Sequence, residues 1–179
     1  MSGKSFRGAF VGRFQPFHLG HLDAAEYALT KCEQLVVVVG SAQYSHTLEN
    51  PFTAGERVMM IKAALDEAGF SRSSYFIIPV EDINYHSMWV DHIRALTPDF
   101  NILLSNEPLT RRLFKEAGIR VESIPFFKRE IYSATEIRNR IVVGADWESL
   151  VPRAVAKFIK EIDGVERMKE LSISDRFNK

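Results

Sequence analysis

Short runs of β-branched and aromatic residues alternate with longer amphipathic stretches along most of this chain. The alternation is typical of repeated βα units, in which parallel strands form a sheet that helices cover. Strands are predicted at Phe6–Val11, Gln34–Gly40, Ser74–Pro79, Asn101–Ser105 and Arg120–Ile124. Helices are predicted at Leu19–Lys31, Thr53–Ala68, Ser87–Leu96 and Pro108–Ala117. The pattern therefore predicts an α/β fold of the doubly wound, Rossmann-like kind, with a mainly parallel sheet of about five or six strands and helices on both faces.

Two helix starts have the form of a capping box, in which a hydroxyl residue is followed three positions later by a carboxylate. They are Thr53-Ala54-Gly55-Glu56 and Ser133-Ala134-Thr135-Glu136. The region from Trp147 to Leu171 predicts further helix, with Pro152 in a first turn, and Ser172–Lys179 is expected to fray. No linker or repeat divides the chain, so residues 1–179 are expected to form a single domain with its core between about residues 6 and 164.

Composition narrows the classes of partner. The chain is 46% hydrophobic and 26% charged, as in ordinary soluble domains. It carries 23 basic and 23 acidic residues, so no net charge attracts nucleic acid or a membrane surface, and a phosphate site must be local. The lone Cys32 excludes an intrachain disulfide, fits a reducing cytoplasm, and is expected to be a buried structural thiol.

A chemically informative run, Gly12-Arg13-Phe14-Gln15-Pro16-Phe17-His18-Leu19-Gly20-His21, follows the first predicted strand. In a doubly wound sheet, ligands bind beyond the carboxyl ends of the strands, where the strand order reverses. The first turn of the next helix offers free N–H groups that favour a phosphate. His18 and His21 lie on one face of that helix, and Gly20 lets an anionic group approach the backbone. The alternatives are that the histidines only cap or pack the helix, or that they bind zinc, for which a suitable third ligand is lacking.

This run resembles the HxGH element of the nucleotidyltransferase superfamily. The longer string GRFQPFHxGH is similar to the form in archaeal-type nicotinamide-nucleotide adenylyltransferases. The resemblance implies that His18, His21 and Arg13 stabilise charge at the α-phosphate of ATP during catalysis. It also implies an ATP and phosphate site that includes Gly12, Phe14, Gln15 and Gly20.

A second candidate, Tyr132-Ser133-Ala134-Thr135-Glu136-Ile137-Arg138, stands at the start of another predicted helix. Ser133 and Thr135 present hydroxyl groups in the first turn, and Arg138 can reach back with its planar guanidinium. The run resembles the SxTxxR signature of the same superfamily. This implies that Ser133, Thr135 and Arg138 bind the β- and γ-phosphates and that Arg138 assists catalysis. A common form of the signature has Ser where this chain has Ala134, so that position is not carried over, and a plain helix cap is the alternative.

Residues after the second and third predicted strands could choose the acceptor. The segments Gly40–Arg57, Val80–Ile83 and Met88–Val90 also resemble the archaeal-type enzymes, so the likeness runs from about residue 7 to residue 164. A mononucleotide site is expected to contain Gly40, Ser41, Asp82, Trp89, Asn106 and Arg57. Trp89 could stack on a pyridine ring while Asp82 fixes its amide or the ribose. The alternatives are core packing for Trp89, a turn or cap for Asp82 and Asn106, and an exposed helix face for Arg57.

Other nucleotide signatures are missing from the sequence. Gly3-Lys4-Ser5 lacks the glycine spacing of a P-loop, and no GxGxxG follows the first strand, which argues against a dehydrogenase. The resemblance implies an enzyme of NAD biosynthesis that joins ATP and nicotinamide mononucleotide to give NAD and pyrophosphate, with Mg²⁺ accompanying ATP and no metal held by the protein itself. It also implies a cytoplasmic homo-oligomer such as a hexamer. The alternatives are a related enzyme with a pantetheine, flavin or polyol phosphate acceptor, and a nucleotide-binding regulator without turnover.

Overall fold

The computed structural model describes residues 6–125 and 132–177, so Gly3-Lys4-Ser5 lies outside the described residues. Five strands in this part of the chain form one parallel sheet in the order β3-β2-β1-β4-β5. Their bounds are Arg7–Gly12 (β1), Gln34–Val39 (β2), Tyr75–Pro79 (β3), Ile102–Leu104 (β4) and Arg120–Glu122 (β5). Each predicted strand is present, with every end within two residues of its predicted position. The order reverses between β1 and β4, which confirms the doubly wound architecture.

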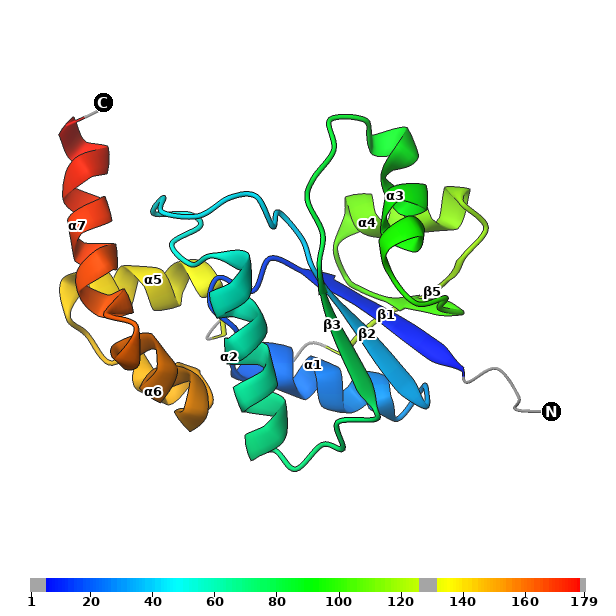
Figure 1. The fold of residues 1–179 in the computed structure, drawn as a ribbon, viewed down its shortest axis with the longest axis horizontal. Helices are drawn as coiled ribbons and strands as arrows, with labels where there is room; N and C mark the ends of the chain where they lie inside the picture. The colour runs from blue at the N-terminus through cyan, green and yellow to red at the C-terminus, as the bar shows by residue number, and fades with distance from the viewer. Residues whose placement is uncertain (1–5, 126–131, 178–179) are drawn as a thin grey trace.

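Helices cover both faces of the sheet (Figure 1). One face carries α1 (Leu19–Leu29) and α2 (Ala54–Glu67), and the other carries α3 (Trp89–Leu96) and α4 (Pro108–Glu116). The short helix η1 (His86–Met88) precedes α3 where the sequence predicted one helix from Ser87. Alternate residues of β2 enter the two cores: Val37 packs on the side of α1 and α2, and Val38 on the side of α3 and α4. Because β2 is buried on both faces, its sequence is a continuous apolar run.

Three further helices, α5 (Ala134–Val143), α6 (Arg153–Glu161) and α7 (Gly164–Phe177), extend the layer that contains α2 (Figure 1). α6 packs on α2, and α7 lies against α5 and α6. The Nη1 and Nη2 atoms of Arg167 in α7 donate to the Glu56 carboxylate at 2.8 and 2.9 Å, which joins the C-terminal helix to the start of α2.

The helical region predicted from Trp147 to Leu171 is interrupted, and that prediction is wrong in two places. A short helix η2 (Glu148–Leu150) is followed by a break, because the residue before a proline is disfavoured in helical conformation and Pro152 becomes the N-cap of α6. A second break follows α6, where Asp163 adopts a left-handed conformation with φ 57°. The last helix, α7, extends beyond the predicted end at Leu171 and continues to Phe177. No helix within the described residues is long and apolar enough to cross a lipid bilayer.

The two predicted capping boxes have different outcomes. In the first, Thr53 Oγ1 accepts the Glu56 N–H at 3.2 Å and Glu56 Oε2 accepts the Thr53 N–H at 2.8 Å, so the box is confirmed. In the second, Ser133 Oγ accepts the Glu136 N–H at 3.5 Å, but the Glu136 carboxylate pairs with Arg140 Nε at 2.7 Å. Only half of that box forms, because the carboxylate finds a cation one turn along the helix.

Candidate active site

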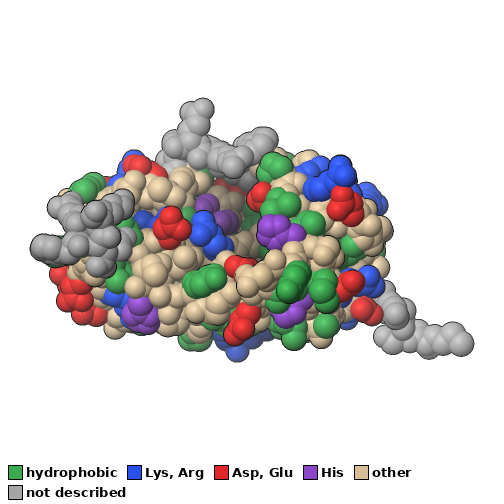
Figure 2. All heavy atoms as spheres, turned by 90° about the horizontal axis from the view of Figure 1, so that it is seen from above, with side chains coloured by type: hydrophobic (Ala, Val, Ile, Leu, Met, Phe, Trp, Pro, Cys, Tyr) green, Lys and Arg blue, Asp and Glu red, His purple; other side chains and the backbone are tan. Residues whose placement is uncertain are grey.

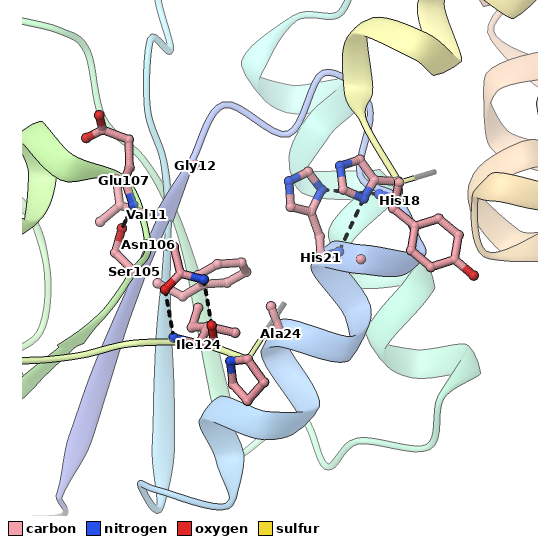
Figure 3. A pocket seen from close by; sticks show the side chains of 13 residues that line it. Val11, Gly12, His18, His21, Ala24, Ser105, Asn106, Glu107 and Ile124 are labelled. Atoms are coloured by element: carbon pink, nitrogen blue, oxygen red, sulfur yellow. Dashed lines mark hydrogen bonds between the residues drawn. The ribbon is translucent and has the colours of Figure 1, made fainter. Parts of the chain in front are cut away.

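A cavity of about 270 Å³ lies beyond the carboxyl ends of β1 and β4, at the point where the strand order reverses. Figure 2 views the molecule from above and shows a hollow in which histidine side chains are visible, with acidic and basic side chains nearby. In Figure 3, His18 and His21 stand on one side of the cavity, and the segment from Ser105 to Glu107 stands on the other. The histidines therefore lie at the edge of the sheet where the sequence predicted a ligand.

His18 and His21 cap the start of α1 by bonding to each other's backbone. His18 Nδ1 accepts the His21 N–H at 3.3 Å, and His21 Nδ1 accepts the His18 N–H at 3.3 Å. This is a capping box built from two imidazoles instead of a hydroxyl and a carboxylate. The two rings stack with centroids 3.5 Å apart and planes inclined by 19°. The two histidines therefore do cap the helix, and this leaves the Nε2 atom of each ring for another partner.

The shared cap fixes the protonation of both rings. A neutral imidazole whose Nδ1 accepts a hydrogen bond carries its proton on Nε2, so each ring can present one N–H donor. Burial lowers the pKa of His18 from 6.5 to about 4. Burial, and then the neighbouring His18, hold the pKa of His21 well below its usual value. At neutral pH the pair therefore offers two uncharged donors at a site where an anion is expected.

Two glycines of the first run are explained by packing within the chain. A Cβ atom on Gly20 would lie 3.0 Å from Tyr132 Cβ and 3.3 Å from the His18 ring. A Cβ atom on Gly12 would lie 2.8 Å from the ring of Phe14. Gly20 thus makes room for the His18 imidazole and for Tyr132, whereas the sequence suggested that it admits an anionic group to the backbone.

The side chains of Phe14 and Gln15 are turned away from the cavity, against the prediction that they help to bind ATP. Phe14 is buried, with its ring centroid 4.9 Å from that of His21. Gln15 is buried, and its carboxamide donates to Phe52 O at 2.9 Å and accepts from Phe52 N at 3.0 Å. Both side chains therefore support the loop from the core. The buried amide of Gln15 is tolerated there because its polar atoms are paired, and the phenyl ring of Phe14 has no polar atom to pair. A contact to ATP from either residue would have to come from its backbone.

The second group of residues that the sequence predicted to bind phosphate lies at the start of α5. Arg138 is buried and donates from Nη1 to Gln15 O at 2.9 Å and from Nη2 to Thr135 Oγ1 at 3.2 Å. The guanidinium thereby joins α5 to the loop after β1, although 123 residues separate Arg138 from Gln15. A helix cap alone, which was the alternative interpretation, does not account for this buried guanidinium. Ser133 and Thr135 lie at the same helix start, as predicted.

Arg13, Arg57 and Arg138 are far apart in the sequence but lie close together near the end of β1. Burial lowers the pKa of Arg57 to about 10 and also lowers the pKa of Arg138, and the charge of Arg13 contributes to both shifts. The Arg13 side chain is exposed. The three guanidinium groups make this loop a local positive region in a chain without net charge.

A second cavity, of about 400 Å³, lies farther along the same edge of the sheet and is lined by Asp82 and Trp89, as predicted. Both carboxylate oxygens of Asp82 have partners: Ser41 N donates to Oδ1 at 3.2 Å and Ser41 Oγ donates to Oδ2 at 2.6 Å. Gln43 fixes the backbone of Asp82 on both sides, because its carboxamide accepts the Asp82 N–H and donates to Asp82 O. Asp82 is therefore oriented before any ligand arrives.

Trp89 shares its indole between the cavity and the core. Its ring lies edge-on to Phe114, with centroids 6.0 Å apart, and packs against the core cluster beneath α3 and α4. The side chain is only partly buried, and it also lines the second cavity. The two roles that the sequence left as alternatives are thus both compatible with one ring.

Two residues expected at the mononucleotide site have other partners. Arg57 is fully buried, and its donors bond to backbone carbonyls, which contradicts both an exposed helix face and a reach towards a phosphate. Gly40 is buried, its N–H donates to Gly12 O at 2.9 Å, and its carbonyl accepts from Arg57. Neither residue has a polar group directed to the second cavity, because both are engaged in joining the turns after β1 and β2.

Asn106 also differs from its expected place. It lines the first cavity and not the second, and its carboxamide bonds to both backbone polar groups of Ile124, at 2.6 and 3.1 Å (Figure 3). Asn106 thus holds the ends of β4 and β5 together. This contact spans 18 residues of sequence and no turn is assigned at Asn106, so its observed role is a tertiary one that neither the ribose nor the turn interpretation described.

Sequence reasoning missed several lining residues. Ser105, Glu107 and Tyr132 line the first cavity, and Asn84 and Thr110 line the second. Their position directly after a strand, or beside a recognised motif, was the available signal. Within the described residues, no group of three or more His, Cys, Asp or Glu side chains could hold a metal ion.

The comparisons with known proteins agree with this geometry. Residues 9–140 match the cytidylyltransferase-like family. The chain is 51% identical over 170 residues to a nicotinamide-nucleotide adenylyltransferase of Methanolobus tindarius, covering 95% of this chain and 96% of that protein. It is 48% identical over 166 residues to the nicotinamide-nucleotide adenylyltransferase of Pyrococcus horikoshii, covering 93% and 89%.

A solved structure shares the fold. The bifunctional NMN adenylyltransferase/ADP ribose pyrophosphatase of Francisella tularensis, crystallised with AMP and a manganese ion, matches with a TM-score of 0.80 and 24% identity. The match covers 97% of this chain and 53% of the other, so this chain spans about half of that protein. From the length and identity of these matches, the chain belongs to the cytidylyltransferase-like family and, within it, to the nicotinamide-nucleotide adenylyltransferases.

Proposed function

We propose that this protein transfers the adenylyl group of ATP to the 5′-phosphate of nicotinamide mononucleotide, giving NAD and pyrophosphate. The observation that carries the proposal is the stacked pair of neutral histidines at the strand-order reversal. The names of the relatives at 48% and 51% identity support the same reaction. The chemistry requires two anionic groups to meet, and the loop after β1 supplies the local positive charge for this.

The histidines would act on the α-phosphate. An oxygen of the mononucleotide phosphate attacks the α-phosphorus, and the bond from that phosphorus to the bridging oxygen of pyrophosphate breaks. The attacking oxygen is already ionised, so no general base is needed and catalysis rests on positioning and charge stabilisation. The Nε2–H groups of His18 and His21 would donate to the non-bridging oxygens as charge builds there. Arg13, exposed at the end of β1, would balance the same charge.

The leaving pyrophosphate would lie at the start of α5. Arg138 uses one N–H of each Nη group within the chain, so Nε and the remaining Nη hydrogens are available for phosphate oxygens. Ser133 and Thr135 would complete this site with their hydroxyls and with the backbone of the helix N-terminus. Mg²⁺ would enter with ATP as part of the substrate and would neutralise phosphate charge.

The second cavity would hold the nicotinamide ring. Trp89 offers an aromatic face and Asp82 a fixed acceptor for the amide N–H or for a ribose hydroxyl. Among the described residues, the cavity lining contains the Asp82 carboxylate and no lysine or arginine. A nicotinate carboxylate there would meet the like charge of Asp82, so we propose that the amide form is the substrate.

One incubation tests the assignment. The protein is mixed with ATP, Mg²⁺ and, separately, the nicotinamide, nicotinate, phosphopantetheine, flavin and polyol phosphate acceptors, and pyrophosphate and product mass are measured. We expect pyrophosphate and NAD with the nicotinamide acceptor, and a lower rate with nicotinate. Turnover with only one of the other acceptors would replace the proposed substrate, and ATP binding without turnover would indicate a regulator. We also propose that the enzyme is cytoplasmic and forms a homo-oligomer such as a hexamer. Sedimentation velocity tests the oligomeric state directly.

A further inference from the structure

Arg57 is an unusual core residue, because a fully buried guanidinium is bonded only to backbone carbonyls. Nε donates to Thr53 O at 3.2 Å, Nη1 to Arg13 O at 2.9 Å and Gly40 O at 2.8 Å, and Nη2 to Ser41 O at 3.1 Å. None of these four partners is a carboxylate. A buried charge is costly unless it is well hydrogen-bonded, so the arrangement must be held by accurate geometry.

The four carbonyls belong to the two turns that form the candidate active site and to the cap of α2. The turn after β1 carries Arg13, and the turn after β2 carries Ser41, whose hydroxyl and N–H hold Asp82. A direct bond from Gly40 N to Gly12 O at 2.9 Å joins the same two turns. Arg57 thus connects the turn beside the histidine cavity to the turn that orients Asp82 in the second cavity.

Both turns contain backbone strain where Arg57 binds. Phe14 and Ser41 adopt left-handed conformations, with φ 53° and 52°, although neither is a glycine. The Arg13 carbonyl lies in the peptide just before Phe14, and the Ser41 carbonyl is that of the strained residue itself. Strained residues of this kind persist only where the surrounding structure over-determines them. One side chain holds two such residues, which indicates that Arg57 does more than fill the core.

We propose that Arg57 is a positioning residue for adenylyl transfer, which sets the relative placement of Arg13 at the α-phosphate and of Asp82 at the mononucleotide. It acts through the backbone of both turns and contacts neither substrate. The inference rests on the proposed function, since it concerns the alignment of the two substrates of that reaction. An error of about 1 Å in such alignment can lower the rate about 10²-fold.

Arg57→Lys is the most direct variant, because it keeps the positive charge and removes the fork that reaches several carbonyls at once. Arg57→Gln is the second variant, because a neutral side chain leaves no unpaired buried charge if the lysine variant fails to fold. Leu65→Ala is the matched control: Leu65 is a buried residue of the same helix, outside both cavities. It loses stability through a cavity without altering either turn.

The measurements are kcat and KM for both substrates, corrected for the folded fraction, and amide hydrogen exchange at Gly40 and Ala42. These two amides donate to Gly12 O and Val80 O, so they report the turn after β2. For the Arg57 variants we expect kcat to fall about 10²-fold and exchange at both amides to accelerate by about tenfold or more. In Leu65→Ala we expect a lower melting temperature with kcat and exchange at these amides unchanged.

Wild-type kcat and KM in the folded fraction of both Arg57 variants would overturn the positioning role and leave Arg57 a purely structural residue. Equal losses of kcat in Leu65→Ala would do the same, because they would reflect general destabilisation. The exchange measurement needs no substrate, so it distinguishes this inference from the proposed function. If exchange is fast in Arg57→Lys but the wild-type protein makes no NAD, the proposed function is refuted. The finding that Arg57 holds the turns in place would then still stand.

Discussion

His18 and His21 each accept the other's backbone N–H through Nδ1, with both bonds 3.3 Å long and the rings stacked at 3.5 Å. The helix cap and the proposed catalytic donors are therefore the same two side chains. The cap fixes the tautomer of each ring and leaves the Nε2–H groups for the phosphate. The structural role of these histidines thus prepares them for the catalytic role that we propose, and variants can separate the two roles.

His18→Asn should keep the cap and lose the donor. Asparagine is a favourable N-cap residue and can accept the His21 N–H, but it has no group at the position of Nε2. We expect a melting temperature near that of the wild type and a turnover lower by about 10²-fold or more. His18→Ala should lose turnover and also about 1 kcal/mol of stability. Thermal unfolding and kcat measured on both variants check this, and wild-type turnover in His18→Asn would reduce His18 to a cap.

The stability of the nucleotide-free protein should depend on His18 below neutral pH. Burial lowers its folded pKa from 6.5 to about 4, so between these values the unfolded chain binds a proton that the folded chain does not. The stabilising contribution is complete above about pH 6.5 and is lost as the pH falls towards 4, to a total of roughly 3 kcal/mol at most. Denaturant unfolding between pH 4 and pH 7 measures it. His18→Asn lacks this titration, and an equally steep loss in that variant would disprove the assignment.

Arg138→Lys should impair turnover although the charge is kept. One ammonium cannot bond to Gln15 O and Thr135 Oγ1 and still present a fork to the pyrophosphate oxygens. We expect kcat to fall about 10²-fold. Arg140→Lys on the same helix is the control, because Arg140 pairs with Glu136 and lies outside both cavities. Equal activity in the two variants would remove Arg138 from the phosphate site.

Trp89→Leu should weaken mononucleotide binding more than folding. Leucine keeps apolar contact with the core beneath α3 and removes the aromatic face, so we expect a loss of about 1–3 kcal/mol in affinity for the mononucleotide, with ATP affinity unchanged. Phe114→Leu is the control, because Phe114 contacts the Trp89 ring from the core and does not line the cavity. This variant should lower the melting temperature without changing the affinity for the mononucleotide. Titration calorimetry on both variants decides between stacking and packing. Unchanged mononucleotide affinity in Trp89→Leu would end the stacking proposal.

The sequence predicted the location of the site well, because location follows from topology. A parallel sheet places the residues after every strand at one edge, so His18 and Asp82 could be assigned to that edge once the strands were found. Ser133 was placed by the helix start that its capping pattern marks. The sequence also predicted the capping start at Thr53, since a local pattern of four residues is sufficient there.

The direction of individual side chains could not be predicted in the same way. Phe14 and Gln15 lie within a recognised string, yet both are directed into the core by the left-handed turn at Phe14 and by the partner Phe52, which is 37 residues from Gln15. Arg57 has no sequence signal for burial, because its partners are backbone carbonyls and not acidic side chains. Such contacts depend on tertiary structure and leave no spacing to recognise.

The central claim is that the α-phosphate of ATP is transferred to the mononucleotide. The most direct measurement incubates the protein with nicotinamide mononucleotide, Mg²⁺ and ATP labelled at the α-phosphate, or in a parallel sample at the γ-phosphate, and follows the label into products. The account predicts that the α-label appears in NAD and the γ-label in pyrophosphate, at equal rates. Transfer of the γ-label to the acceptor, or release of the α-label as AMP without formation of NAD, would contradict it.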